Sequence, residues 1–171
     1  MATTVGSLNK LTHDNFIELV TGEALLACED NFKISSLLIA QSALESGWGK
    51  SSLAYKYNNL LGRKWASNNI ITKKYVSLKT QEYQNGGYIT IYSKFCVYAS
   101  ISDCFRDYLW LLHNIYLDKK KTKLRYQRVL DSKDYKEACS MIKACGYATG
   151  KDYDKSLIKI IEEYKLSKYD K

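Results

Sequence analysis

The segment from Ile34 to Lys50 constrains the fold more than any other stretch, because it joins an apolar helical stripe to a carboxylate and two glycines. Side chains three and four positions apart lie on one face of an α-helix, so this spacing predicts a helix packed against a core. The stripe comprises Ile34, Leu37, Leu38, Gln41 and Glu45. Glu45 therefore continues the buried face, where burial favours the protonated form of a carboxyl group. Gly47 and Gly49 are expected to end the helix and to let other backbone approach Trp48.

Glu45 has two interpretations. Most glutamates on helices are solvated and stabilise only their own turn. Here the apolar stripe, the two glycines and the adjacent Trp48 favour an active-site acid. We therefore expect Glu45 to be a buried, proton-carrying acid that packs against Trp48.

The length of 171 residues fits one domain with a core of its own. We expect residues 1–11 to be a poorly ordered extension, residues 12–171 to form the domain, and the protein to be a monomer. No apolar run approaches the roughly 20 residues that cross a bilayer, so we expect no membrane insertion. Residues 1–7 lack the basic and apolar regions of a signal peptide, which indicates either a fragment or export by another route.

The formal net charge of +8 favours anionic partners. Nucleic acid, anionic lipid and an acidic wall polymer all fit this charge, so charge alone leaves the partner open. Five cysteines at irregular spacings do not predict a disulfide framework, and two histidines, His13 and His113, are too few for a typical zinc site. The phosphate-loop, serine-hydrolase and zinc-protease signatures do not occur in the sequence.

The periodicity predicts a mostly helical α+β protein with one small β-lobe inserted between helices. Thr12 and Ser100 are candidate N-caps, and Lys119–Lys121 is expected to close the helix that Ser100 begins. The predicted helices cover about 13–31, 35–45, 50–57, 101–115, 134–144 and 153–166. Alternating segments at 75–80 and 88–92 flank an Asn-Gly-Gly turn and predict a hairpin or a three-stranded sheet, with Glu82 near its tip.

Glu45 and Glu82 form a candidate pair of acids. One is expected in an apolar environment and the other in a wetter hairpin, and such pairs of carboxyl groups cleave glycosidic bonds. For Glu82 a solvated hairpin charge is the strong alternative. Tyr147 lies in a glycine-bracketed loop between two helices, where it could line a groove and stack on a sugar. The basic segment 119–128 could contact phosphates, although a solvated helix end explains it better.

The segment Ile39–Lys50 and four shorter elements after it resemble the bacterial endo-β-N-acetylglucosaminidase domain of glycoside hydrolase family 73, the flagellar-rod hydrolase and autolysin group. The segment Ile39–Lys50, followed by Leu53-Ala54, is similar to the signature of that family. Four further elements match it in order over about residues 12–166: Asn59–Gly62, Thr80–Tyr83, Phe95 with Tyr98, and Gly146–Thr149. Two positions depart from the family pattern, with Cys96 in place of arginine and Gly150-Lys151 in place of Asp-Pro.

The resemblance implies a lysozyme-like α+β fold, with a helical body and a β-hairpin lobe flanking a cleft. It implies hydrolysis of the N-acetylglucosaminyl-β-1,4-N-acetylmuramic acid bond of peptidoglycan, without a metal or a cofactor. Glu45 would be the general acid and Glu82 the second carboxylate. The implied substrate-binding residues are Gln41, Trp48, Asn59, Tyr98 and Tyr147.

The implied partners are peptidoglycan glycan strands and anionic wall polymers, not nucleic acid, and the implied place of action is the cell wall, outside the cytoplasm. An autolysin and a phage lysin both fit. Glu82 could activate water, which inverts the anomeric centre, or assist the acetamido group of the substrate, which retains it. The alternatives are a muramidase or lytic transglycosylase that cuts the other glycan bond, and a non-catalytic basic module that binds wall polymer.

Overall fold

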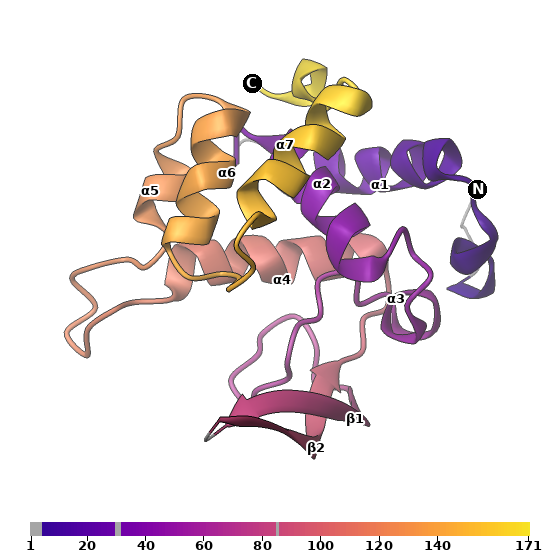
Figure 1. The fold of residues 1–171 in the computed structure, drawn as a ribbon, viewed down its shortest axis with the longest axis vertical. Helices are drawn as coiled ribbons and strands as arrows, with labels where there is room; N and C mark the ends of the chain where they lie inside the picture. Colours follow the sequence, from indigo (N-terminus) through magenta and orange to yellow (C-terminus); the bar gives the residue numbers. More distant parts are fainter. Residues whose placement is uncertain (1–4, 30–31, 85) are drawn as a thin grey trace.

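The computed structural model describes residues 5–29, 32–84 and 86–171, which form a helical body and one β-hairpin lobe (Figure 1). This arrangement confirms the predicted mostly helical, lysozyme-like α+β fold. The elements are η1 (Val5–Lys10), α1 (His13–Cys28), α2 (Ser35–Ser46), α3 (Ser52–Tyr57), β1 (Tyr75–Gln84), β2 (Gly87–Cys96), α4 (Ile101–Asn114), α5 (Gln127–Leu130), α6 (Tyr135–Ala144), α7 (Tyr153–Glu163) and η2 (Leu166–Tyr169).

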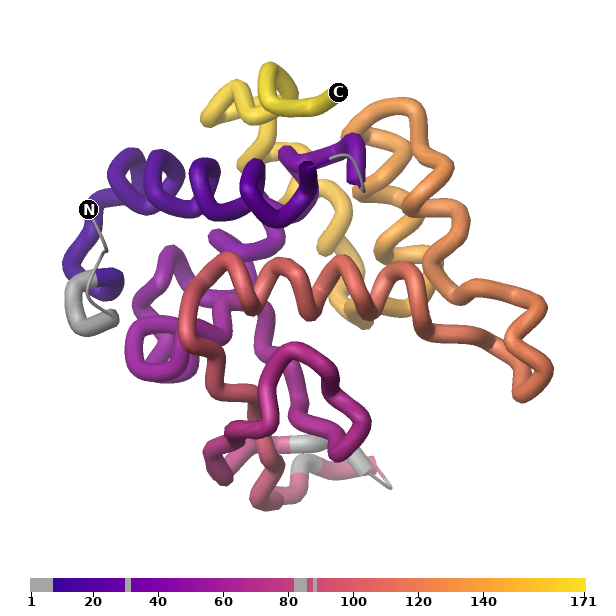
Figure 2. The backbone as a smooth tube through the Cα atoms, turned by 180° about the vertical axis from the view of Figure 1, so that it is seen from behind, coloured from indigo at the N-terminus to yellow at the C-terminus, as the bar shows by residue number. Residues whose placement is uncertain are grey.

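Helix α2 is the centre of the body. Ten of its twelve residues are buried, and it contacts α1, α6, α7 and η2. The back view shows α1 and α4 on the opposite side of the molecule from α7 (Figure 2). A helix that is covered on all sides needs apolar or small side chains around its whole circumference, and the sequence of α2 supplies them.

Side-chain caps begin the helices where the sequence predicted them. The Thr12 hydroxyl accepts a hydrogen bond from the Asn15 amide at 3.3 Å, and the Ser100 hydroxyl accepts one from the Asp103 amide at 3.0 Å. These bonds satisfy backbone donors that a helix leaves unpaired in its first turn. Asp134 caps α6 in the same way.

The hairpin is longer than predicted and has two strands among the described residues. Its antiparallel register runs from Tyr75 opposite Cys96 to Gln84 opposite Gly87. The strands lie at one end of the molecule, below the helices in Figure 1. In the part of the hairpin that the structure describes, neither strand packs closely on a helix, so the lobe is held mainly by the segments that lead into and out of it.

Two other expectations differ from the structure. Helix α4 ends at Asn114 and not at Lys119–Lys121, because Ile115 is extended and the chain continues into a loop closed by a bridge between Tyr116 and Leu124. Part of the N-terminal extension, expected to be poorly ordered, forms the 3-10 helix η1, and Leu8 of that helix is buried. None of the helices in the described ranges is both long and apolar enough to cross a membrane.

Candidate active site

Glu45 lies in the last turn of α2, which Gly47 ends in the left-handed conformation with φ 57°. The residue is exposed to solvent, so the expectation that Glu45 is buried is wrong: the apolar stripe ends at Gln41 and the last turn of the helix leaves the core. Surrounding protein atoms still displace part of the water around the carboxyl group. This desolvation raises the pKa of Glu45, and a hydrogen bond from Tyr153 opposes the rise.

A chain of hydrogen bonds runs from the core to the Glu45 carboxyl group. The Tyr108 hydroxyl donates to Gln41 Oε1, and Gln41 Nε2 donates to the Tyr153 hydroxyl at 3.0 Å. Tyr153 then donates to Glu45 Oε1 at 2.7 Å. Burial raises the pKa of Tyr153, so this hydroxyl keeps its proton and remains a donor. Gln41 is therefore a fully buried residue that orients Tyr153.

Tyr147 stands beside this chain on the loop between α6 and α7. Its ring lies edge-on to the rings of Tyr108 at 5.9 Å and Tyr126 at 6.5 Å, and is tilted toward Tyr153 at 6.2 Å. Arg125 holds the turn that leads into Tyr147, because its guanidinium donates to the carbonyl oxygens of Cys145 at 2.8 Å and Gly146 at 2.9 Å.

Two cavities meet at Glu45, Tyr147 and Ala148. The first, of about 600 Å³, extends along the start of α7 past Thr149, Asp152 and Ser156. The second, of about 450 Å³, extends toward the base of the β-lobe and is lined by Arg63, Lys64, Leu111, Arg125 and Tyr126. Glu45 and Tyr147 thus line both cavities at the place where the two cavities meet.

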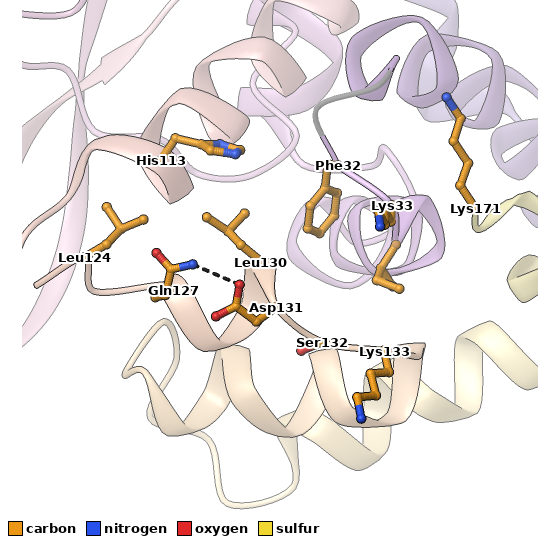
Figure 3. A pocket seen from close by; sticks show the side chains of 11 residues that line it. Phe32, Lys33, His113, Leu124, Gln127, Leu130, Asp131, Ser132, Lys133 and Lys171 are labelled. Carbon is orange, nitrogen blue, oxygen red and sulfur yellow. Dashed lines mark hydrogen bonds between the residues drawn. The ribbon is translucent and has the colours of Figure 1, made fainter.

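A third cavity, of about 710 Å³, lies between α5 and the segment before α2 and does not include Glu45 (Figure 3). Its lining mixes apolar side chains such as Phe32 and Leu130 with Lys33, Lys133 and Asp131. A hydrogen bond of 2.9 Å from Gln127 holds the Asp131 carboxylate at this cavity. We assign the candidate active site to the groove at Glu45, because desolvation raises the pKa of Glu45 and this residue lies where two cavities meet.

Tyr98 and Asn59 belong to a hydrogen-bond network with Arg63, Asn69 and Asp107, which we call the frame of the site. The Tyr98 hydroxyl donates to Asp107 Oδ2 at 2.5 Å, and the same buried carboxylate accepts from Arg63 at 3.0 Å and from Asn69 at 3.1 Å. Asn59 is 1% exposed and bonds the backbone of Arg63 and Cys96. These bonds join the segments on both sides of the hairpin to α4, so neither residue faces the groove.

Trp48 does not lie beside Glu45. Gly47 and Trp48 both have positive φ, which turns the chain away from the groove. The indole ring stacks on His13 at 3.8 Å and packs against Phe16 and Tyr164. Trp48 therefore joins α1 to the C-terminal end of α7, and the expected contact between Trp48 and Glu45 is absent.

Glu82 lies on β1 opposite Ile89, close to the hairpin tip as predicted. Its side chain lies outside the described residues, so its role stays a prediction. Cys96, which stands where the resembling family has arginine, is buried at the end of β2. The guanidinium of Arg63 reaches the same neighbourhood and bonds Asp107, so a fixed cation is present there from another element.

Sequence reasoning gave no role in the site to Tyr153 and Asp107, and it placed Arg125 only in the basic segment 119–128. Tyr153 acts on Glu45 across 108 positions of the chain, and no local spacing signals such a contact. All five cysteines are free thiols. No group of three or more metal-binding side chains occurs in the part of the chain that the structure describes.

Residues 23–166 match the family described as mannosyl-glycoprotein endo-beta-N-acetylglucosaminidase. Over 156 residues, or 91% of the chain, the sequence is 36% identical to the exo-glucosaminidase LytG of Bacillus subtilis and 33% identical to a probable N-acetylmuramidase of Lactococcus lactis. The chain spans 52% of the first relative and 34% of the second, so it corresponds to about half of their length or less. The fold is similar to that of the catalytic domain of the autolysin Auto from Listeria monocytogenes, with a TM-score of 0.80, 31% identity and coverage of 92% of this chain and 87% of that chain.

Proposed function

The chain belongs to the mannosyl-glycoprotein endo-beta-N-acetylglucosaminidase family, and from this premise we propose that it hydrolyses the N-acetylglucosaminyl-β-1,4-N-acetylmuramic acid bond of peptidoglycan. The observation that carries the proposal is the Glu45 carboxyl group, which lies where two cavities meet and accepts a hydrogen bond from Tyr153. Two adjoining cavities of about 600 and 450 Å³ on either side of this acid fit a glycan strand better than a small ligand.

Glu45 is the proposed general acid. It must carry a proton at the pH of the reaction and deliver it to the glycosidic oxygen of the leaving sugar, so a carboxyl pKa above the usual value favours this role. Tyr153 holds one carboxyl oxygen, which leaves the other free to face the substrate. Positive charge then builds on the ring of the N-acetylglucosamine residue as the bond breaks.

Glu82, on strand β1 of the hairpin, is the proposed second carboxylate. We favour a water attack that Glu82 assists, which inverts the anomeric centre. Nuclear magnetic resonance of the first product separates the two routes: an α-anomer supports inversion, and a β-anomer indicates participation of the substrate acetamido group. Tyr147 is the proposed sugar platform, because its ring lines both cavities.

The test of the acid compares Glu45→Gln with Glu18→Gln on purified cell walls. Glu18 is an exposed glutamate on α1, so its substitution makes the same chemical change away from the groove. We expect Glu45→Gln to lower the rate of wall hydrolysis by about 100-fold or more, the usual contribution of a general acid. Near-wild-type hydrolysis by folded Glu45→Gln would refute the assignment.

A muramidase is the second candidate, because one relative is named a probable N-acetylmuramidase. Analysis of the reducing ends separates the two activities. Reducing N-acetylglucosamine supports our proposal, while reducing N-acetylmuramic acid or an anhydro end supports a muramidase or a lytic transglycosylase. Binding to walls without any turnover would instead indicate a non-catalytic module.

We further propose that the domain acts outside the cytoplasm, on the cell wall, as a monomer. Several relatives are named peptidoglycan hydrolases, which supports this place of action. The formal charge of +8 favours association with anionic wall polymers. If this contact is electrostatic, binding of the inactive Glu45→Gln variant to walls should weaken as salt increases.

A further inference from the structure

One face of the β-hairpin gathers aromatic rings and lysine side chains. Paired residues of an antiparallel sheet lie on the same face, and every second residue of a strand shares that face. The register therefore places Tyr75 and Lys79 of β1 on one face with Tyr92 and Lys94 of β2. Trp65 joins them from the segment before β1, because its amide donates to the Lys94 carbonyl oxygen at 2.9 Å and its ring lies 4.9 Å from the Tyr75 ring. We call these five residues the lobe face.

The lysines of the lobe face lie over its rings. Lys94 Nζ is 4.3 Å from the centre of the Tyr75 ring and 5.4 Å from the centre of a Trp65 ring. Lys79 Nζ is 5.8 Å from the centre of the Tyr92 ring, which lies opposite it in the register. An aromatic ring attracts a cation without neutralising it, so both lysines keep their positive charge.

The lobe face is exposed and lies outside the groove at Glu45. Tyr92 is 69% exposed and Tyr75 is 45% exposed, and both lysines are exposed as well. The remaining exposed positions that the structure describes on this face are neutral, namely Ser77, Gln81 and Thr90. No residue of the lobe face is among the described residues that line the two cavities at Glu45. A ligand on the lobe face therefore leaves the groove free.

Folding alone does not explain this composition. A cross-strand pair such as Lys79 with Tyr92 stabilises a hairpin, but pairs of threonines or of opposite charges do so without exposing rings. Tyr92 leaves most of its side chain in water, so it adds little buried area to the fold. Exposed rings that gather with charges of one sign are typical of an interaction surface.

We propose that the lobe face binds an acidic polysaccharide strand, separate from the strand in the groove. Tyr75 and Tyr92 stack on sugar rings, and Lys79 and Lys94 contact carboxylates of the same strand. Four residues of extended chain separate Tyr75 from Lys79, or about 13 Å, so the face is longer than one sugar ring.

The choice of partner rests on the proposed function, because wall glycan supplies both sugar rings and carboxylates. The lobe is at one end of the molecule in Figure 1, so it can contact one strand while Glu45 acts on a neighbouring strand. Two contacts with the same wall slow the release of the domain, since the second contact forms at a high effective concentration. The lobe face thus serves retention on the wall, and the groove serves cleavage.

The test measures binding to three immobilised polymers by the Glu45→Gln variant, which is expected to leave glycans uncut. The first polymer is peptide-free wall glycan with free lactyl carboxylates. The second is chitin, which has N-acetylglucosamine rings but no carboxylate. The third is polyphosphate, which has charge but no sugar rings. Together they separate stacking on sugar rings from pairing of charges.

Two further substitutions are added to this variant one at a time. Tyr92→Thr keeps a side chain that suits a strand and removes the ring, so binding to both glycans should weaken about fivefold. Lys79→Gln should weaken binding to the acidic glycan about threefold and leave binding to chitin unchanged, because only the first glycan carries charge. With Glu45 restored, both substitutions should lower kcat/KM on whole walls and leave kcat/KM on a short soluble glycan unchanged, since a short glycan needs only the groove.

The matched controls lie on helices away from the hairpin. Lys56 of α3 is exposed and lies 5.7 Å from the centre of the Tyr55 ring, so Lys56→Gln removes a lysine in a similar contact. Leu26 of α1 is 60% exposed, so Leu26→Gln removes a comparable exposed apolar side chain. Both controls should bind all three polymers as the parent does, and thermal unfolding checks that every variant is folded.

The outcomes separate the inference from the function on which it rests. If wild type cleaves walls but Tyr92→Thr and Lys79→Gln bind the acidic glycan like their parent, the lobe face is not a binding surface and the function stands. Binding to polyphosphate that matches binding to the acidic glycan and ignores Tyr92→Thr would also overturn the inference, because the partner would then need no sugar rings. If wild type cuts no wall while the two substitutions still weaken glycan binding, the proposed function fails and the lobe face stands.

Discussion

The hydroxyl group of Tyr153 contributes to the stability of the domain and affects the pKa of Glu45. The substitution Tyr153→Phe tests both effects. The substitution removes two hydrogen bonds, one accepted from Gln41 and one donated to Glu45. Gln41 is fully buried, so its Nε2 loses its partner where water does not reach it. Glu45 is exposed, and water replaces the hydrogen bond that it loses.

The magnitude follows from this difference. An unsatisfied buried donor costs about 1–3 kcal/mol, and the lost bond to the exposed carboxyl group adds little. We therefore expect the free energy of unfolding to fall by about 2 kcal/mol, which for a chain of this size corresponds to a Tm lower by about 4–8 °C. The hydrogen bond from Tyr153 lowers the pKa of Glu45, so its removal raises that pKa further.

The assay measures thermal unfolding and the pH dependence of kcat/KM on one glycan. A general acid is active while protonated, so a higher pKa of Glu45 moves the loss of activity at high pH to still higher pH. Tyr135→Phe is the matched control, because its hydroxyl bonds Glu162 at 3.2 Å on the exposed surface. An unchanged Tm together with an unmoved alkaline limb in Tyr153→Phe would refute the reasoning.

Three further substitutions test the site and its frame. The pKa of Glu45 is higher in the folded protein than in the unfolded chain, so the free energy of unfolding falls as pH rises from the unfolded-state pKa through the folded-state pKa. Glu45→Gln should therefore unfold at a higher temperature than wild type at pH 7. Near pH 3 the two proteins should unfold at the same temperature, because residue 45 is uncharged in both. Asp107→Asn leaves the Arg63 guanidinium without its carboxylate. The free energy of unfolding, measured by chemical denaturation, should therefore fall by about 2–4 kcal/mol. Gly146→Ala requires a side chain at φ 76° and places its Cβ 2.8 Å from Arg125 Nη2. We therefore expect kcat/KM to fall and the free energy of unfolding to decrease by about 1 kcal/mol.

Local features were predictable from the sequence. The helix caps at Thr12 and Ser100 and the helix that ends near Glu45 depend on residues within four positions of one another, whereas Asn85 of the predicted hairpin turn lies outside the described residues. The resemblance supplied the fold. Each of these predictions uses periodicity or a short motif, and such patterns determine secondary structure through neighbouring residues alone.

Contacts between distant segments were not predictable. Trp48 was assigned to the site because it follows Glu45 by three positions, but two residues with positive φ send its ring toward α1. Burial of Glu45 was inferred from a stripe that the structure ends at Gln41. Tyr153 reaches Glu45 only because α7 packs on α2, and the sequence carries no sign of that packing.

The separation of the hairpin from the helical body has a consequence for how such domains diversify. The two strands pair with each other and make few contacts with the helices, while the frame at Asp107 fixes only their ends. Substitutions and insertions near the hairpin tip therefore leave the core and Glu45 almost unaffected. Selection can therefore alter the hairpin without first having to compensate a loss of folding stability.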